Sequence, residues 1–542
     1  MLKRQKLITS ARCAGFVSFF CYLGGLMEFK SILYQTGYEE KPVIEEPSYF
    51  KNLNLDQLIK AITLDKDDYD LKSFFYSPLK QMENIHFRQA VVTDLEKDDF
   101  FRSSSAFSEK IFTLNQQFDQ CLTSLNRSGD KHQDYLEKGR YLDIIETYCE
   151  EVKRYYECLT HSGLKALGFL SLGDFLGDYI HSNAFVNLSK TTSRLKDELF
   201  ALDYCILIKG DTVKVKKYEG EPDHSSEVIQ LLERFNPKRQ STKQEDKLHE
   251  GLATHVENNI LNLAAKLYPQ SFGQLDDYCL NHHSFMNPTI LIFSRELQFY
   301  IAYFDYIKAI KKMGLSFSLP EITNSKTDLY NDDGFDLALA DKLIKTPENM
   351  VCNSFYLKNN ERIILISGPN QGGKTTFSRH FGQIHHLGCL GLPIQGSRSR
   401  IFHFDQIFTH FEQEENINSL QGKLSDDLIR MKAIFDAATP NSLVIINEIL
   451  SSTTLNDAIL IGTNFITMLA DLDLICVFVT FITELASCHE KIVSMVSMVS
   501  EVDASERTYT LIRKEPDGLA YANHIVQRYH LDYFSINERI SS

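Results

Sequence analysis

The chain has 542 residues, of which 43% are hydrophobic; this is enough for several globular domains and excludes an intrinsically disordered protein. The formal net charge of −15 argues against a protein that holds nucleic acid by its overall charge, although a local basic patch could still do so. The eleven cysteines are scattered with no C-x-x-C pair, which argues against a zinc site or a disulfide framework and predicts a reducing, cytoplasmic environment.

The first 27 residues combine a basic start with an apolar run. The basic residues before that run are Lys3, Arg4, Lys6 and Arg12. This layout resembles a signal peptide or a short membrane anchor, but the run at 14–27 is short for a spanning helix and no clear cleavage site follows it. We therefore expect translation to start at Met27, and we expect no membrane association. Residues 28–53 indicate an irregular lead-in.

Helical periodicity dominates residues 54–345, where we expect a mainly α-helical domain. Its clearest helix is predicted to begin at Asn287-Pro288, because asparagine caps helices and proline fits their first turn. Gly314 is predicted to end it. The apolar face of this helix is interrupted by charged residues, so it indicates a core helix and not a membrane span.

Residues 203–220 have a different pattern, which predicts a β-hairpin within the helical domain. An apolar arm, a turn at Gly210-Asp211 and a second arm that alternates apolar residues with lysine follow one another. We expect the lysines to stand on one solvated face, where Lys214, Lys216 and Lys217 are candidate contacts to DNA. An edge strand whose lysines prevent aggregation is an equally good interpretation.

Residues 346–542 form a predicted nucleotide-binding domain, organised around the stretch 363–376. An apolar run predicts a buried parallel strand, and a helix is expected from near Lys374. The pattern between them, G-x-x-x-x-G-K-T, is typical of a phosphate-binding loop, because its glycines let backbone N–H groups point at phosphate oxygens. The helix N-terminus adds partial positive charge. Lys374 is expected to reach the β- and γ-phosphates, and the Thr375 hydroxyl to ligate Mg²⁺. The candidate nucleotide-binding residues are Gly368, Pro369, Asn370, Gln371, Gly372, Gly373, Lys374, Thr375 and Thr376.

A second apolar strand, at 442–446, ends in Asn447-Glu448, and a third is predicted at 474–480. P-loop ATPases place two acidic residues at such a strand end; the first helps to hold Mg²⁺ through water and the second polarises the attacking water. Here Asn447 is the candidate metal-associated residue, although its amide brings no charge. Glu448, with Lys374, is the candidate catalytic residue. The alternation of strands and helices predicts an α/β domain with a parallel sheet.

Four stretches of this domain resemble the MutS family of DNA mismatch-repair proteins. They are residues 367–376 (SGPNQGGKTT), 404–410 (FDQIFTH), 438–444 (ATPNSLV) and 447–457 (NEILSSTTLND). The resemblance is strong over about 361–530 and weaker but continuous over about 54–345, which looks like the family's helical core and lever region. It implies an ABC-type P-loop ATPase domain that binds ATP and Mg²⁺ and works as a homodimer. It also implies binding to duplex or branched DNA, with other repair proteins as further partners.

The resemblance also implies how the partner subunit completes each ATP site. A signature segment would face the partner's ATP, and by position it contains Ser419, Gly422 and Lys423. Asp457, after the catalytic strand, would approach the dimer seam. Asp517-Gly518 and the helix that follows resemble the family's C-terminal dimerisation element.

Three positions depart from the family pattern. Asn447 replaces the metal-associated aspartate, Phe481 replaces a histidine after the third strand, and Gly422 replaces the signature serine. A missing hydrogen bond to the γ-phosphate or a weaker Mg²⁺ site would each cost roughly 10²–10³ in rate. The departures therefore leave the rate of hydrolysis open.

Only about 50 residues precede the helical core, too few for the family's mismatch-reading domain, so we do not expect mismatch recognition. We expect instead a dimeric ATPase that clamps DNA during repair or recombination, with ATP hydrolysis coupled to DNA binding. The alternative is a nucleotide-gated scaffold that binds ATP with little hydrolysis and engages a protein partner.

Overall fold

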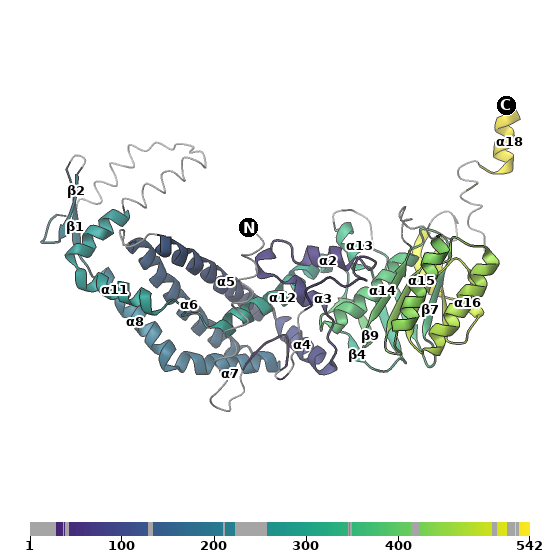
Figure 1. Ribbon diagram of the computed structural model, residues 1–542, viewed down its shortest axis with the longest axis horizontal. Coiled ribbons are helices and arrows are strands. Elements are labelled where there is room, and N and C mark those ends of the chain that lie inside the picture. The colour runs from purple at the N-terminus through teal and green to yellow at the C-terminus, as the bar shows by residue number, and fades with distance from the viewer. Residues whose placement is uncertain are drawn as a thin grey trace.

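The computed structural model describes residues 29–35, 37, 43–127, 134–209, 212–222, 257–344, 346, 350–412, 422–500, 507–516, 526 and 531–541. It is elongated, with a helical part at one end and a mixed α/β part at the other (Figure 1). The expected extension at 1–27 lies outside the described residues. Among the residues that are described, no helix is long and apolar enough to cross a membrane.

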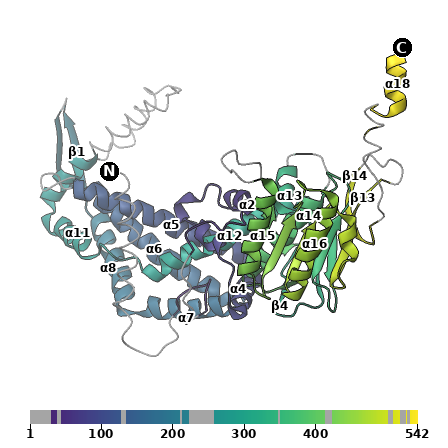
Figure 2. The same cartoon turned by 45° about the vertical axis from the view of Figure 1, so that its right-hand side comes forward.

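Long helices build the first part of the chain. They are α2 (Leu55–Ile62), α3 (Lys72–Tyr76), α4 (Met82–Leu95), α5 (Asp98–Arg127), α6 (Tyr135–His161), α7 (Leu167–His181), α8 (Asn183–Phe200), α11 (Pro269–Asn281) and α12 (Pro288–Lys311), with a 3-10 turn, η1 (Asp67–Tyr69), after α2. Helix α5 packs against both α6 and α12. The hairpin of β1 (Tyr204–Lys209) and β2 (Thr212–Lys217) lies at the end farthest from the α/β part (Figures 1 and 2).

Helix α12 begins where its capping signals predict and runs through the helical core. The Asn287 side chain accepts a hydrogen bond of 2.8 Å from the Thr289 backbone N–H, and Pro288 occupies the first turn. The helix ends at Lys311, shortly before Gly314, whose φ of 82° favours glycine. Its buried apolar residues include Ile290, Phe293, Leu297, Ile301 and Ile307. The helix whose apolar face is interrupted by charged residues is therefore a core helix, as its sequence predicts.

Glu296 of α12 is a carboxylate inside this core. The Ser31 hydroxyl donates to its Oε1 (2.7 Å), and the Ile32 backbone N–H donates to its Oε2 (2.9 Å). Burial raises the pKa of Glu296 to about 7, although these hydrogen bonds and the charges of Arg88 and Arg295 act in the opposite direction. Glu296 thus ties the segment 29–35 to the centre of the helical part.

We expect this carboxylate to make stability depend on pH. The folded-state pKa of Glu296 lies above the ordinary value, so its contribution to stability is present at low pH and is lost as pH rises towards 7 and beyond. The loss amounts to about 3 kcal/mol. Glu296→Gln removes the titration, so the difference in unfolding free energy between this variant and the wild type should change by that amount between pH 4.5 and 8. Urea unfolding across this range measures it. Glu83→Gln, at an exposed position of α4, is the control, and an unaltered pH dependence in Glu296→Gln would contradict the assignment.

The lysines of the hairpin do not share one face. Tyr204 pairs with Lys217, and Leu207 pairs with Lys214. Because successive residues of a strand point to opposite faces, Lys214 and Lys216 stand on one face and Lys217 on the other. There the Lys217 Nζ lies 5.1 Å from the centre of the Tyr268 ring. The prediction of a single lysine face is therefore wrong for Lys217, because strand alternation separates neighbouring residues.

Six strands form the central sheet of the α/β part, in the order β10-β11-β12-β7-β13-β14. Their bounds are β7 (Ile363–Ser367), β10 (Ile407–Phe411), β11 (Leu443–Asn447), β12 (Ile475–Val479), β13 (Ile492–Val499) and β14 (Arg507–Arg513). All neighbours are parallel except β13 and β14, which are antiparallel. The helices of this part are α13 (Leu337–Leu343), α14 (Lys374–Cys389), α15 (Lys423–Ala437), α16 (Leu455–Asp471) and α18 (Tyr533–Ser541), with a 3-10 turn, η3 (Thr483–Ser487).

Both faces of the central sheet are buried, which explains its apolar strands. In β7, Ile364 and Ile366 belong to the core that includes α14 and the helical part. The alternate residues, Ile363 and Leu365, belong to a second cluster beneath α15 and α16. A strand covered on both faces needs an apolar residue at every position, as the run at 363–366 indicates.

A second sheet joins residues on either side of the expected domain boundary at 345/346. Its order is β4-β9-β5-β6, with β4 (Glu321–Thr323), β5 (Leu329–Gly334), β6 (Asn353–Leu357) and β9 (Arg398–Phe402). The short strands β3 (Phe317–Ser318) and β8 (Ile394–Gln395) also pair. Residues from about 317 onward therefore pack as part of the α/β unit. We propose to begin the second domain there.

Candidate nucleotide-binding site

The glycine-rich loop at 368–373 joins the end of β7 to the start of α14. It lies at the carboxyl edge of the parallel strands, where α/β sheets bind ligands. Gly368 has a φ of 124° and Gly373 a φ of 88°, values that favour glycine. Helix α14 begins at Lys374, so its free backbone N–H groups face the loop. The predicted strand, loop and helix are thus present in the predicted order.

Strands β13 and β14 hold this loop from one side. The Ser497 hydroxyl donates to the Gly372 carbonyl oxygen (2.5 Å), and Arg507 Nε donates to the Asn370 carbonyl oxygen (3.1 Å). A Cβ added at Gly372 would lie 2.2 Å from the Ser497 hydroxyl oxygen. Glycine is therefore required at 372 because of this close approach.

Lys374 is almost fully buried, with 3% of its side chain exposed. Its Nζ donates to the carbonyl oxygens of Gly368 (3.1 Å) and Pro369 (3.0 Å), and it lies 3.6 Å from Glu448 Oε1. The ring of Phe481 lies over the same ammonium group, with its centre 4.4 Å away. Burial lowers the pKa of Lys374, and the charge of Glu448 acts in the opposite direction. The structure therefore brings together the two predicted catalytic residues.

Asn447 is the last residue of β11, and Glu448 follows it beside the loop. Glu448 adopts a left-handed backbone conformation (φ 57°), and its backbone N–H bonds to the Val479 carbonyl oxygen of the neighbouring strand (3.0 Å). Such a conformation is uncommon for a residue with a long side chain, and strained positions of this kind concentrate at functional sites. It turns the chain sharply after the strand, and the carboxylate meets Lys374.

Asn447 provides a test of the predicted metal site. Its Oδ1 is buried and has no hydrogen-bond partner. A buried amide oxygen without a partner is costly, and it is suited to accept a hydrogen bond from a metal-bound water. The hydroxyl of Thr375 belongs to the first turn of α14, one residue after Lys374. These residues fit a site for Mg²⁺, which prefers oxygen ligands and keeps several waters.

The segment predicted to face a partner's ATP is only partly described. Ser419 lies outside the described residues, as do Asp517 and Gly518. Gly422 and Lys423 begin α15, where the Lys423 ammonium pairs with Glu412. Asp457 lies in the first turn of α16, and its backbone N–H bonds to the capping Thr454 hydroxyl.

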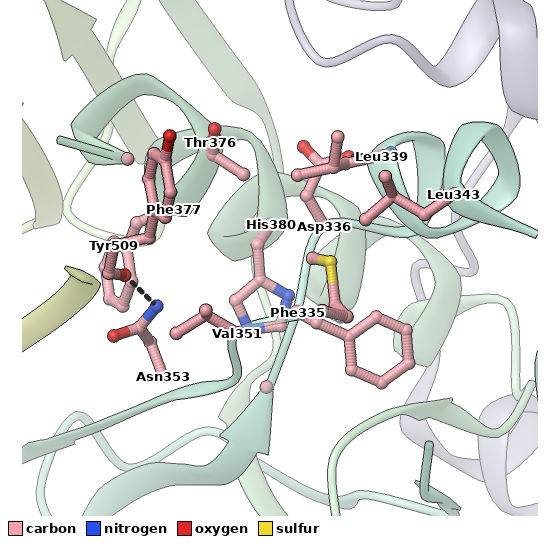
Figure 3. Close-up of a pocket in the computed structure, with 13 residues that line it drawn as sticks. Phe335, Asp336, Leu339, Leu343, Val351, Asn353, Thr376, Phe377, His380 and Tyr509 are labelled. Carbon is pink, nitrogen blue, oxygen red and sulfur yellow. Dashed lines mark hydrogen bonds between the residues drawn. The ribbon is translucent and has the colours of Figure 1, made fainter. Parts of the chain in front are cut away.

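A cavity of about 250 Å³ opens beside the loop (Figure 3). Gly373 and Thr376 border it, and His380 lies at its centre in the figure. Its lining is mainly apolar and comes from Phe335, Leu339, Leu343, Met350, Val351 and Phe377, with Asp336, Asn353 and Tyr509. Apolar cavities with a few polar groups are the usual form of small-molecule sites.

The motifs of the sequence did not indicate the residues that complete this site. Ser497, Arg507 and Tyr509 come from β13 and β14, which lie far from the glycine-rich loop in sequence and reach it only through the order of the sheet. The exposed aromatic ring at position 509 carries no local pattern.

Comparison with known proteins relates part of this chain to one protein family. The family model "MutS domain V" matches residues 364–532, which include the loop, β11 and β14. The DNA mismatch repair protein MutS of Orientia tsutsugamushi (strain Boryong) is 28% identical over 213 residues, which are 38% of this chain and 24% of that protein. The endonuclease MutS2 of Clostridium novyi (strain NT) is 27% identical over 214 residues, 39% of this chain and 27% of that protein. Residues 364–532 of this chain therefore resemble domain V of the MutS family.

The matches to these relatives cover about a quarter of the relatives' own length. The likeness to the MutS family model therefore lies in the α/β part of the chain. The described residues of this part form a mixed α/β structure, as predicted for residues 346–542.

Proposed function

We propose that this chain is an ABC-type ATPase of the MutS family that binds ATP at the loop 368–376. The observation that carries the proposal is the Lys374 ammonium, held between loop carbonyl oxygens and Glu448 at the carboxyl edge of a parallel sheet. A buried ammonium beside a carboxylate, next to a helix N-terminus, is suited to bind and cleave a polyphosphate. Steady-state release of inorganic phosphate from ATP tests this proposal, which falls if the chain neither binds nor turns over ATP.

Each group of the site has a task in transferring a phosphoryl group to water. Backbone N–H groups at Gly373 and in the first turn of α14 bind phosphate oxygens, and Lys374 neutralises charge on the β- and γ-phosphates. Glu448 orients the attacking water and accepts its proton. Mg²⁺, when bound, supplies further charge neutralisation at the phosphates, and Thr375 and Asn447 are the residues that would hold it.

The cavity beside Gly373 and Thr376 is suited to the base of the nucleotide. It opens next to the loop that would hold the phosphates, and its lining is mainly apolar. ATP and Mg²⁺ are therefore the proposed ligands of one continuous site.

Helix α14 is bonded directly to the helical part of the chain. Gln383 Nε2 donates to the Leu53 carbonyl oxygen (2.9 Å), and His386 Nε2 donates to that of Phe75 (2.8 Å). Arg379 Nε bonds to the Asn52 carbonyl oxygen (3.2 Å). Helix α14 begins at the loop that would bind the phosphates. A shift of α14 would therefore also move the residues of the helical part that are bonded to it. These contacts support the proposal that ATP state controls binding of DNA by a homodimer, in repair or recombination.

The hairpin at the tip of the helical part is the proposed DNA contact. Lys214 is exposed, whereas Lys216 forms an ion pair with Glu221, and Lys217 stands on the other face. We expect Lys214→Glu to weaken binding to duplex DNA and to reduce the salt slope by about 1. Lys217→Glu makes the same change of charge on the opposite face and is the matched control.

Fluorescence anisotropy of labelled duplex, measured at several salt concentrations with the full chain, gives both quantities. If Lys214→Glu binds DNA as the wild type does, or if Lys217→Glu is impaired to the same extent, the hairpin face is not the contact.

A nucleotide-gated scaffold is the second candidate function. Two features of the site favour it: Asn447 brings no charge to Mg²⁺, and Phe481, which lies over the Lys374 ammonium and is 47% exposed, has no hydrogen-bond donor to offer a phosphate. Such a protein would bind ATP tightly and release phosphate very slowly. Binding and turnover measured on the same sample separate the two candidates.

A further inference from the structure

The ammonium group of Lys374 is closed off from solvent by its neighbours. Only 3% of the side chain is exposed, because two loop carbonyl oxygens, the Glu448 carboxylate and the ring of Phe481 surround it. A phosphate oxygen accepts a hydrogen bond from this ammonium only in direct contact with it. At least one of the surrounding groups must therefore move before Lys374 can bind a phosphate.

Phe481 is the group among these that can move at the lowest cost. The residue is 47% exposed, so its ring loses little buried area when it turns into solvent. Glu448 is attracted to the ammonium by its opposite charge, and its side chain is only 22% exposed. The carbonyl oxygens belong to a loop that Ser497 and Arg507 hold by hydrogen bonds.

The backbone on both sides of Phe481 is fixed, so its side chain is the part that is free to turn. The Thr480 backbone N–H donates to the Ile366 carbonyl oxygen (3.0 Å), and the Thr480 hydroxyl accepts from the Ile482 backbone N–H (3.0 Å). Both Thr480 and Ile482 are buried. Because β12 lies between β7 and β11 in the sheet, the residue that follows it stands between the loop and Glu448.

The ring and a polyphosphate compete for one cation. The face of an aromatic ring carries partial negative charge, which attracts the ammonium of Lys374 and repels phosphate oxygens. We propose that Phe481 is a gate that covers Lys374 and turns away when a polyphosphate binds, so that the ring lowers the affinity for ATP. The inference rests on the proposed nucleotide site, and it concerns any ligand with a triphosphate, because the gate acts at the phosphate end.

Phe481→Trp converts the gate into a reporter, because the chain contains no tryptophan. An indole ring also binds a cation through its face. In the full chain, addition of inorganic tripolyphosphate with Mg²⁺ should shift the tryptophan emission to longer wavelength and increase its quenching by acrylamide, since the indole turns into solvent. Phe200→Trp is the matched control. Its ring is 79% exposed, has the Lys196 Nζ 6.0 Å from its centre and lies on α8, far from the loop (Figure 1).

Removing the aromatic face should raise the affinity for polyphosphates. Phe481→Leu keeps an apolar side chain without a π-face, and Phe481→Ala removes the side chain almost entirely. Calorimetric titration should show that both variants bind tripolyphosphate and ATP about 3- to 30-fold more tightly than the wild type does, which is the factor that one cation–π contact accounts for. Thermal unfolding of the two variants shows that the fold is kept.

Two results would overturn the gate and leave the nucleotide site intact. One is a Phe481→Trp chain that binds tripolyphosphate with no change in tryptophan emission. The other is a folded Phe481→Leu chain that binds tripolyphosphate no more tightly than the wild type does. A wild-type chain that binds neither ATP nor tripolyphosphate would overturn the proposed function itself, and this inference with it.

Discussion

Glu448→Gln is expected to lower the rate of ATP hydrolysis by roughly 10²–10³ while ATP binding is retained. The glutamate is 22% exposed at the end of β11, and its Oε1 lies 3.6 Å from the Lys374 ammonium. Glutamine has the same shape and meets the same backbone requirement at φ 57°, but it cannot accept a proton from water. The change therefore removes the base and leaves the loop, the lysine and the cavity in place.

Phosphate release under single-turnover conditions measures this rate, and a parallel titration measures ATP affinity. Glu484→Gln, at an exposed position of the 3-10 turn that follows β12, makes the same chemical change away from the loop and is the control. A Glu448→Gln variant that hydrolyses ATP at the wild-type rate would show that another group activates the water.

Lys374→Ala is expected to weaken ATP binding by roughly 10² or more, because charge-assisted hydrogen bonds to phosphate oxygens are lost from a buried position. The same change removes the donor to Gly368 and Pro369 and leaves Glu448 without its cation. The Glu448 carboxylate would then face the incoming phosphates without the Lys374 charge, so repulsion adds to the lost attraction.

Equilibrium titration with ATP and Mg²⁺ measures the loss. Lys432→Ala removes an exposed lysine of α15 that pairs only with Asp436 among the described residues, and it should bind ATP as the wild type does. Thermal unfolding of both variants shows whether the fold is kept. If Lys374→Ala binds ATP as tightly as the wild type does, the phosphates of ATP do not bind at Lys374.

Sequence patterns predicted those features of the fold and the site that depend on residues close together in the chain. The apolar run before Gly368, the capped start of α12 and the polar residues after β11 are each determined within a few residues, and the structure shows them as expected. Other parts depend on tertiary order. Ser497 and Arg507 reach the loop because β13 lies beside β7 in the sheet, which no local periodicity encodes.

Two expectations differ from the structure for physical reasons. The lysines at 216 and 217 are neighbours in sequence, yet strand alternation puts them on opposite faces of the hairpin. The second domain was expected to begin after residue 345, whereas β5 and β6 pair across that position. Strand pairing brings together residues that are distant in the chain. The composition along the chain therefore does not indicate which strands pair.

The most direct measurement is steady-state phosphate release from ATP by the full chain with Mg²⁺, with and without duplex and branched DNA. The proposed function predicts turnover that changes when DNA is added and that is lost in Lys374→Ala, because α14 bonds the phosphate loop to the helical part. Tight ATP binding with no turnover and no response to DNA would contradict it and would favour the nucleotide-gated scaffold.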